Sequence, residues 1–275
     1  MRRALFFTAG ALTAVPLVGH LLWRRRSSEI ERRILSYSAD GPGGELTPDR
    51  VADVPEPVAR FFKHAFAAKQ RIIRSARIRQ TGQFFLNGSW RPMRAEQLFS
   101  ATRPAFQWDA RISAAPFMPV YVRDAYVDGH GMMRADMLAL YPMVNQAGVS
   151  ELDSAALLRY LGEAAWFPTR LLPGDGLSWR RVDDNAAEAT LTDGRITVSL
   201  QFRVDADGAL VELYSPGRFR EVNGAYVPTP WRARALGEET ISGVRMMNPT
   251  VVEWMLPEGP LPYWRGRITQ VDYTY

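Results

Sequence analysis

Cysteine is absent from the 275-residue sequence. Disulfide bonds, thiol catalysis and thiolate metal sites are therefore excluded. Histidine is scarce too, with three residues in the chain, which argues against a multi-histidine metal site. The sequence also lacks the G-x-S-x-G, H-E-x-x-H and Walker motifs and a complete G-x-G-x-x-G. The sequence therefore predicts no cofactor and no metal and indicates no particular reaction, and an enzyme is the less favoured class of function.

Acidic and basic residues balance once the first 26 residues are set aside. Five of the 34 Lys and Arg residues lie in that stretch with no acidic residue, which leaves 29 basic against 29 acidic groups in the remainder. The net charge of +5 therefore comes from the N-terminus. Because nucleic-acid binding requires a basic surface, no nucleic-acid partner is predicted.

Residues 4–23 contain no Asp, Glu, Lys or Arg. As a helix rising about 1.5 Å per residue they would span about 30 Å, the thickness of a bilayer core. Arginines flank the stretch at positions 2 and 3 and at positions 24 to 26. A cleaved signal peptide is the alternative, but no well-placed small-x-small site follows the apolar run. The sequence predicts a single-pass N-terminal membrane anchor over residues 1–26, with the side of the membrane undetermined.

Two segments follow the predicted anchor. Residues 27–53 are expected to form a juxtamembrane linker. It starts as a helix, with Ile30, Ile34 and Leu35 spaced for one helical face, and the run Asp40-Gly41-Pro42-Gly43-Gly44 then breaks regular structure. Residues 54–275 are expected to form a single domain that starts with an amphipathic helix at 55–69.

One long helix is predicted in the middle of the chain, beginning at Ser150. Ser150 and Asp153 have the spacing of a capping box, and Pro168 ends the helix because it lacks a backbone N–H. Apolar residues cover nearly the whole circumference in between, so the helix is expected to be buried on nearly all sides. Glu163 is the exception. It is either a carboxylate paired with an arginine at the edge of the core or a functional acid in an apolar pocket.

Alternating apolar and polar residues predict antiparallel strands on both sides of this helix, most clearly at 106–112 and 195–204. Asn-Gly or Asp-Gly pairs starting at positions 87, 128, 193, 207 and 223 separate such runs, as in β-hairpins. Strands and helices do not alternate, which argues against a doubly wound fold. The predicted fold class is α+β, with a strongly curved antiparallel β-sheet, a half-barrel, wrapped around the central helix, preceded by an N-terminal helix and the transmembrane anchor.

Five stretches together resemble an uncharacterised family of bacterial proteins, a domain of unknown function, over residues 54–275. They are FQWDARI (106–112), VRDAYVDGHGMM (122–133), AAWFPTRLLP (164–173), ATLTDG (189–194) and LPYWRGRI (261–268). The family has no assigned activity, so the resemblance implies no catalytic residue. The order of elements is also similar to the bacterial lipoprotein-carrier fold, in which a helix plugs the concave face of a curved sheet. Architecture alone does not fix function.

Two groups of polar residues are candidates for chemistry. Asp124 is expected to share a strand face with Asp128 and, with Asp109 and His130, to form an acid/base or oxygen-ligand cluster. The alternative is that Asp124 pairs with an arginine on a neighbouring strand while Asp128 and His130 lie in a turn. Arg265 and Arg267 either bind an anionic head group or make cross-strand salt bridges.

Methionines are concentrated between positions 132 and 143. Their flexible thioethers suit an adaptable apolar lining, although core packing explains them as well. Adding the large aromatic residues gives the set of candidate ligand-binding residues. They are Trp108, Asp124, Met133, Met137, Glu163, Trp166, Arg265 and Arg267.

Three functions are compatible with these features. The preferred hypothesis is a membrane-anchored module that binds a lipid or other apolar ligand in the concave face of the sheet. The alternatives are an enzyme that acts on an apolar or membrane substrate through Asp, Glu or Arg residues, and a structural envelope protein. An apolar cavity would distinguish the first hypothesis from the third, and convergent carboxylates with a raised pKa in that cavity would favour the second.

Overall fold

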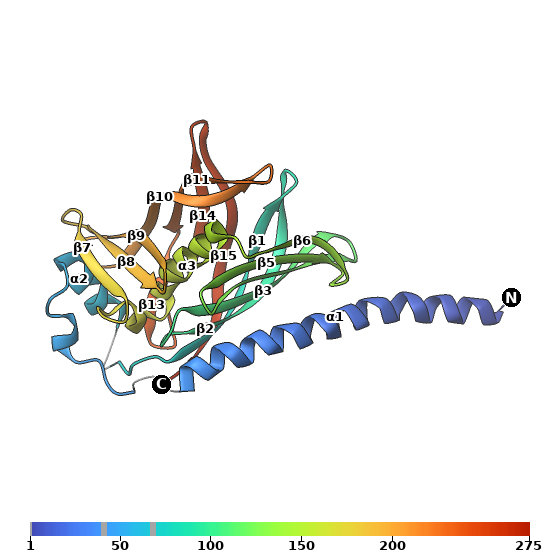
Figure 1. Cartoon of the computed structure of the whole chain (residues 1–275), viewed down its shortest axis with the longest axis horizontal. Coiled ribbons are helices and arrows are strands. Elements are labelled where there is room, and N and C mark those ends of the chain that lie inside the picture. The colour runs from blue at the N-terminus through green and yellow to red at the C-terminus, as the bar shows by residue number, and fades with distance from the viewer. Residues whose placement is uncertain (1, 40–42, 67–69) are drawn as a thin grey trace.

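A computed structural model describes residues 2–39, 43–66 and 70–275, with the backbone alone for residues 2–17 and 48 (Figure 1). Thirteen strands form one antiparallel sheet. In sheet order the strands are β6 (Tyr141–Ala147), β5 (His130–Met137), β4 (Met118–Val127), β3 (Ala105–Ala115), β2 (Ser89–Ser100), β1 (Ser75–Leu86), β15 (Gly259–Thr274), β14 (Thr250–Leu256), β11 (Ala225–Ala235), β10 (Leu210–Val222), β9 (Ile196–Val204), β8 (Ala186–Asp193) and β7 (Leu177–Arg181).

The Asn-Gly and Asp-Gly pairs lie where the hairpin prediction put them. Each of the five pairs connects two neighbouring strands of the sheet. At Asn87-Gly88, Asp128-Gly129 and Asn223-Gly224 both residues have positive φ, as a type I′ turn requires. Consecutive strands therefore pair as a meander through most of the sheet. The predicted α+β class with a curved antiparallel sheet is confirmed.

The central helix α3 (Ser150–Glu163) lies inside the curve of the sheet (Figure 1). It contacts β4 and β5 near one edge of the sheet and β9 and β10 near the other. Strands so far apart in sheet order reach one helix only because the sheet curls around it. Leu157 and Leu161 are almost completely buried there, as the apolar circumference predicted.

Two glycines let the helix approach the sheet closely. A Cβ on Gly131 of β5 would lie 2.7 Å from the backbone oxygen of Leu152, and one on Gly162 would lie 3.1 Å from Leu200. Asp153 accepts a hydrogen bond of 2.6 Å from the backbone N–H of Gly131. These contacts fix how deeply α3 sits in the sheet.

The helix begins at Ser150 as predicted, but its cap and its C-terminal end need correction. Val149 is the N-cap, without a side-chain cap, and Ser150 donates to Glu151. The capping-box prediction is therefore wrong, because Asp153 is engaged with β5. The α-helix ends at Glu163, and short 3-10 turns follow at Ala164–Trp166 and Pro168–Leu171. Pro168 thus starts a new turn and does not stop the α-helix.

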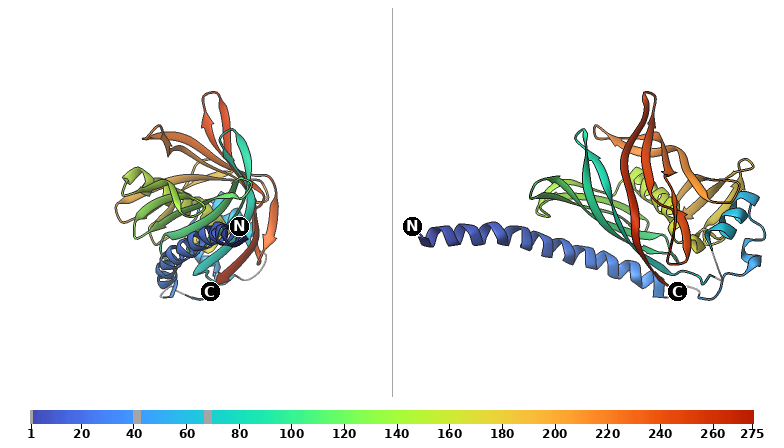
Figure 2. Two further views of the ribbon diagram at one scale, coloured as in Figure 1. Left: turned by 90° about the vertical axis from the view of Figure 1, so that its right-hand side faces the viewer. Right: turned by 180° about the vertical axis from the view of Figure 1, so that it is seen from behind.

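A single helix, α1 (Arg2–Ala39), runs along the outer face of the sheet, and its N-terminal part extends beyond the sheet (Figure 2). It contacts β2, β3 and β4. Trp23 and Ile34 are buried in this contact. Residues 27–39 are a continuation of this helix, in line with the helix expected at the start of the juxtamembrane segment, whereas residues 40–42 of the predicted break lie outside the described residues.

The expected membrane span, residues 4–23, lies within α1, and the side chains of residues 2–17 are outside the described part. Within the part of the chain that the structure describes, no helix is long and apolar enough to cross a membrane. The transmembrane anchor is therefore unsupported.

Small elements complete the end of the sheet at the β9–β10 turn, where Gly208 lies against the backbone of Arg60 in α2 (Glu56–Ala65). Pro48–Val51 is a 3-10 turn, and α2 packs against β8, β9 and the two-stranded hairpin β12 (Glu238–Ile241) and β13 (Val244–Met247). Its buried apolar stripe contains Val58, Phe61 and Phe62, as the amphipathic pattern predicted. The strands β6, β7, β12 and β13 had not been separately expected.

Candidate binding cavity

A cavity of about 620 Å³ lies between the C-terminal half of α3 and the turns of the β1–β2 and β10–β11 hairpins, called the hairpin tips below. At its inner end it is lined by Gly162, Glu163 and Trp166 of α3 and the turn after it. At its outer end it reaches Asn87 in the β1–β2 turn and Glu221 near the β10–β11 turn. The apolar lining comprises Phe84, Leu86, Trp108, Ile112, Ala114, Val120, Val122, Met133, Ala135, Met137, Met143, Val144, Leu213, Trp231, Ala233, Met247, Val252, Trp254 and Trp264.

Strand alternation explains why this face is apolar. In β4, Val120, Val122 and Asp124 line the cavity. The residues between them point to the outer face, because side chains alternate along a strand. Asp124 is thus the one charged residue that β4 directs inward.

A polar network crosses the inner end of the cavity. The guanidinium of Arg159 on α3 donates to Asp124 on β4 at 2.6 Å and to Glu163 one turn later at 2.9 Å. The second oxygen of Glu163 accepts from Gln97 at 2.7 Å. One cation therefore serves two carboxylates, and each carboxylate has a donor.

The network continues into the sheet through amide side chains. Gln80 donates to Gln97 at 3.1 Å and accepts from the indole N–H of Trp108 at 2.9 Å. The Arg159 guanidinium also lies 5.0 Å from the centre of the Trp108 ring. A chain of hydrogen-bonded side chains thus links β3, β1, β2, α3 and β4 in a region otherwise lined by apolar side chains.

Burial changes the acid–base behaviour of this network. Burial raises the pKa of Glu163, although Arg159 and Gln97 act in the opposite direction. Burial by itself would lower the pKa of Arg159, but Glu163 and Asp124 raise it. Arg159 therefore stays a cation, and burial favours the neutral form of Glu163.

A second polar group lies on the cavity wall near the outer end. Arg218 of β10 donates to the hydroxyl oxygen of Tyr263 of β15 at 3.0 Å, and the indole N–H of Trp231 donates to the same oxygen at 2.8 Å. The Arg218 guanidinium lies 5.1 Å from the ring centre of Trp231 and 5.6 Å from that of Trp254. Aromatic rings therefore flank this cation.

Six of the eight predicted ligand-binding residues line the cavity: Trp108, Asp124, Met133, Met137, Glu163 and Trp166. Arg265 and Arg267 do not. Arg265 donates to Gln83 at 2.7 Å, and Arg267 forms an ion pair with Glu239. Both arginines alternate with inward-facing Trp264 and so lie on the outer face. Ligand binding by any of the eight residues stays a prediction.

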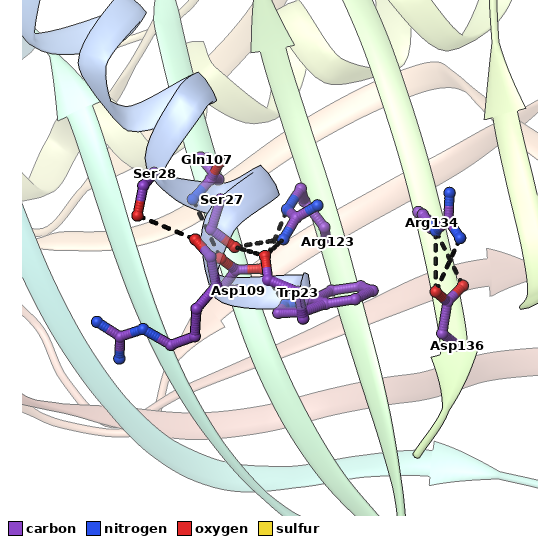
Figure 3. A network of polar contacts seen from close by, with 9 residues as sticks. Trp23, Ser27, Ser28, Gln107, Asp109, Arg123, Arg134 and Asp136 are labelled. Atoms are coloured by element: carbon purple, nitrogen blue, oxygen red, sulfur yellow. Dashed lines mark hydrogen bonds and ion pairs between the residues drawn. The ribbon is translucent and has the colours of Figure 1, made fainter. Parts of the chain in front are cut away.

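The predicted cluster of Asp109, Asp124 and Asp128 is wrong. Asp109 lies on the outer face beneath α1, where it pairs with Arg123 at 3.3 Å and accepts from Trp23 at 2.9 Å (Figure 3). Asp128 lies in a turn and binds Arg33 at 3.0 Å. Strand alternation separates Asp109 from Asp124, and the turn directs Asp128 away from the strand face.

The alternative to the acid cluster is correct for Asp128, which lies in the turn, and differs in part for the other residues. His130 is the first residue of β5, directly after the turn, and is largely exposed, 3.5 Å from Asp153. Asp124 does pair with an arginine, but this is Arg159 of the helix rather than a strand residue. Among the residues that the structure describes, no group of three or more His, Asp or Glu side chains could hold a metal ion.

Sequence reasoning missed Gln80, Gln97 and Arg159 of the inner network and Arg218 and Tyr263 of the wall. The spacing of four between Arg159 and Glu163 was a usable signal, because such pairs meet on a helix. The others had no signal in the sequence, because they meet through pairing between distant strands.

A shallower groove of about 310 Å³ lies elsewhere on the sheet, lined by residues that include Arg203, Glu212 and Arg232. Arg232 pairs with Glu212 at 3.6 Å and with Glu253 at 2.6 Å, and Arg203 pairs with Asp183. Its charges therefore satisfy one another, and the larger cavity is the better candidate site.

Comparisons with known proteins give a family without an activity. A solved structure from Desulfovibrio piger, a DUF1329 family protein, is similar at a TM-score of 0.41 and 11% identity, over 79% of this chain and 90% of that one. A LolA superfamily protein from Nitrosomonas europaea is similar at a TM-score of 0.40 and 11% identity, over 80% of this chain and 92% of that one. No curated protein matches the sequence. The model of a family of unknown function, DUF6544, matches residues 44–266, and the chain belongs to that family.

Proposed function

We propose that the protein binds a lipid or another apolar molecule in the cavity between α3 and the hairpin tips. The observation that carries this proposal is the cavity itself, about 620 Å³ with a mostly aliphatic, aromatic and methionine lining. Pockets that bind small molecules typically measure about 300–1,000 Å³ and combine an apolar lining with a few placed polar groups. Met133 and Met137 suit ligands of irregular shape, because methionine side chains adapt to their contacts.

The inner network supports binding over catalysis. A catalytic acid or base needs a proton that it can exchange with a substrate. Both oxygens of Glu163 already accept hydrogen bonds, from Arg159 and Gln97, and Asp124 accepts from Arg159. The network instead forms a fixed polar floor against which the end of an apolar ligand would stop.

The test is to identify what the purified protein carries. The full chain would be transferred from detergent to amphipol, extracted with organic solvent, and the extract analysed by mass spectrometry. A stoichiometric lipid or apolar metabolite is expected. A clean extract, also after incubation with total membrane lipid, would contradict the proposal.

A pair of variants locates the bound molecule. Ala135 lines the cavity and Ala147 is exposed on the neighbouring strand. Ala135→Phe fills part of the cavity and is expected to lower the bound amount at least several-fold, whereas Ala147→Phe should leave it unchanged. Equal loading of the two variants would place the molecule elsewhere.

We also propose that residues 4–23 hold this domain at a membrane. The uncharged run flanked by arginines supports this, as does the extension of the N-terminal part of α1 beyond the sheet. The full chain is expected to stay in the membrane pellet after a carbonate wash. The double change Leu12→Arg with Val15→Arg should release it, whereas Ser36→Arg should not. Recovery of the unchanged chain in the soluble fraction would overturn this part of the proposal.

A further inference from the structure

Arg218 and Arg220 point into the cavity because of an irregularity in β10. Ser215 pairs with Trp231 and Arg218 pairs with Thr229, so β10 has one extra residue between these pairs. Without it, alternation from Leu213 and Ser215 would turn position 219, a phenylalanine, inward. With it, Arg218 and Arg220 line the cavity in its place. β-Bulges commonly re-aim side chains at functional sites.

Hydrogen-bond donors at this point lack acceptors. The Nε of Arg218 is buried and has no partner among the described residues. The hydroxyl oxygen of Tyr263 accepts from both Trp231 and Arg218, and no described residue accepts its own proton. Buried donors are normally paired, so a buried donor without an acceptor on a cavity wall is a candidate contact for an anion.

Positive charge around these donors is also unpaired. Arg91 and Arg220 line the same outer part of the cavity, and neither side chain has a hydrogen bond or an ion pair within the described ranges. Glu221 is the one carboxylate in that part of the lining, and it accepts from the backbone N–H of Gly224 at 2.6 Å. The inner network is different, because its single cation is matched by two carboxylates.

We propose that this wall holds the anionic group of an amphiphile, a carboxylate or phosphate attached to an acyl chain. The inference rests on the proposed function, because the acyl chain would occupy the apolar cavity. The guanidinium of Arg218 and the hydroxyl of Tyr263 bind the anionic oxygens, and Arg91 and Arg220 contribute further positive charge. Arginine suits this role because its planar guanidinium pairs with carboxylate and phosphate oxygens. Trp231 and Trp254 hold the Arg218 guanidinium in place.

The experiment compares ligands that share a tail and differ in charge. Binding of dodecanoate and dodecanol to the full chain in amphipol would be measured by tryptophan fluorescence. Dodecanoate is expected to bind at least ten-fold more tightly than dodecanol. Dilauroylphosphatidate and dilauroylglycerol form a second pair with shared tails. A larger ratio of anion to neutral affinity in this pair than in the first indicates a phospholipid as the source of the anion, and a smaller ratio indicates a free fatty acid.

Variants assign the preference to the wall. Arg218→Met keeps most of the side-chain volume and should lower dodecanoate affinity at least ten-fold while leaving dodecanol unchanged, and Tyr263→Phe should act in the same sense with a smaller effect. Arg195→Met removes an exposed arginine elsewhere and is the control. Deletion of Gly217 removes the extra residue of β10 and should abolish the preference for the anion.

The outcomes separate this inference from the proposed function. Equal affinity for dodecanoate and dodecanol, or equal losses for both in Arg218→Met, would overturn the anion site and leave apolar binding standing. Absence of binding by all four ligands would overturn both. Urea unfolding of each variant shows whether it is folded. If Arg218→Met does not fold, the affinities of Tyr263→Phe for dodecanoate and dodecanol test the anion site in its place.

Discussion

Arg159 is the residue on which the charge balance of the cavity depends. It lies between Asp124 and Glu163 and is the only ion-pair partner of either carboxylate among the described residues. Buried charges are tolerated when they are paired and hydrogen-bonded. Removing the single cation therefore leaves two carboxylates without compensation.

Replacement of Arg159 by methionine is expected to lower the free energy of unfolding by about 3–5 kcal/mol, the range for breaking a buried ion pair by removal of one partner. Urea denaturation followed by circular dichroism measures this. Arg180 pairs with Glu188 on the surface, so Arg180→Met should change stability by at most about 1 kcal/mol. Similar losses in the two variants would contradict the role of Arg159.

Glu163 is expected to make stability depend on pH. Burial raises its pKa in the folded protein, so the folded state holds a proton that the unfolded state has already released. The free energy of unfolding should therefore fall as the pH rises from the usual glutamate pKa to the folded pKa, and then level off. Each unit of pKa difference corresponds to about 1.4 kcal/mol.

The measurement is urea unfolding at several pH values, with Glu163→Gln as the comparison. Glutamine keeps the shape and does not titrate, so the variant should lose this part of the pH dependence. Asp183 is on the surface, and its pKa is lowered by hydrogen bonds from Asn185 and Arg203. Asp183→Asn should not change the fall in the free energy of unfolding with rising pH. The prediction would be contradicted if the free energy of unfolding changed with pH in the same way in the unchanged protein and in Glu163→Gln.

At the scale of elements, the position of α3 follows from its contacts with β5. Gly131 allows the backbone of β5 to approach that of the helix near Leu152, and Asp153 holds the two together. A helix seated further out would open the inner end of the cavity, because Arg159 and Glu163 are on the same helix.

Gly131→Ala is expected to destabilise the protein by about 1–3 kcal/mol, as overpacking in a core does, because the new Cβ would lie 2.7 Å from the Leu152 oxygen. It should also reduce ligand binding in the cavity. Gly43→Ala is the control, since nothing lies within 4 Å of its Cβ position. Thermal unfolding of both variants checks this, and an unchanged melting temperature for Gly131→Ala would show that the helix can shift without loss.

At the scale of the whole molecule, α1 is fastened to the outer face by buried Ile34, by ion pairs with Arg77 and Asp128, and by one buried polar group around Trp23. Trp23 donates to Asp109, and the Arg123 guanidinium lies 4.2 Å from the centre of the Trp23 ring (Figure 3). Arg123 also donates to the backbone oxygen of Trp23 and to Ser27. The main core is on the other face of the sheet, so α1 should be able to detach without unfolding the sheet.

Trp23→Ala is expected to accelerate hydrogen exchange in α1 around residues 23–34 at least ten-fold while β4 stays protected. The reason is that local opening depends on local contacts. Leu22→Ala is the control because Leu22 is 45% exposed. Faster exchange in β4 as well as α1 would show that the helix and the sheet open as one unit.

Patterns that act over a few residues were predictable in this protein. Alternation along 106–112 placed Trp108 inward, the Asn-Gly and Asp-Gly pairs placed the hairpins, and the apolar circumference of 150–163 placed the helix in the core. Alternation applied to β3 and β4 together would also have separated Asp109 from Asp124. The N-cap of α3 was missed because Asp153 bonds to β5, a contact that local sequence does not encode.

The sequence by itself determined the α+β class, the balance of charge outside the N-terminus and the apolar side of most strands, because these depend on composition and on short-range periodicity. Only the tertiary structure decided that Arg159 lies between Asp124 and Glu163, and that Arg218 and Arg220 face the cavity. The first arrangement requires α3 to sit against β4, and the second requires one extra residue in β10 relative to β11. Both depend on how segments distant in the chain pair and pack, and no local pattern specifies that.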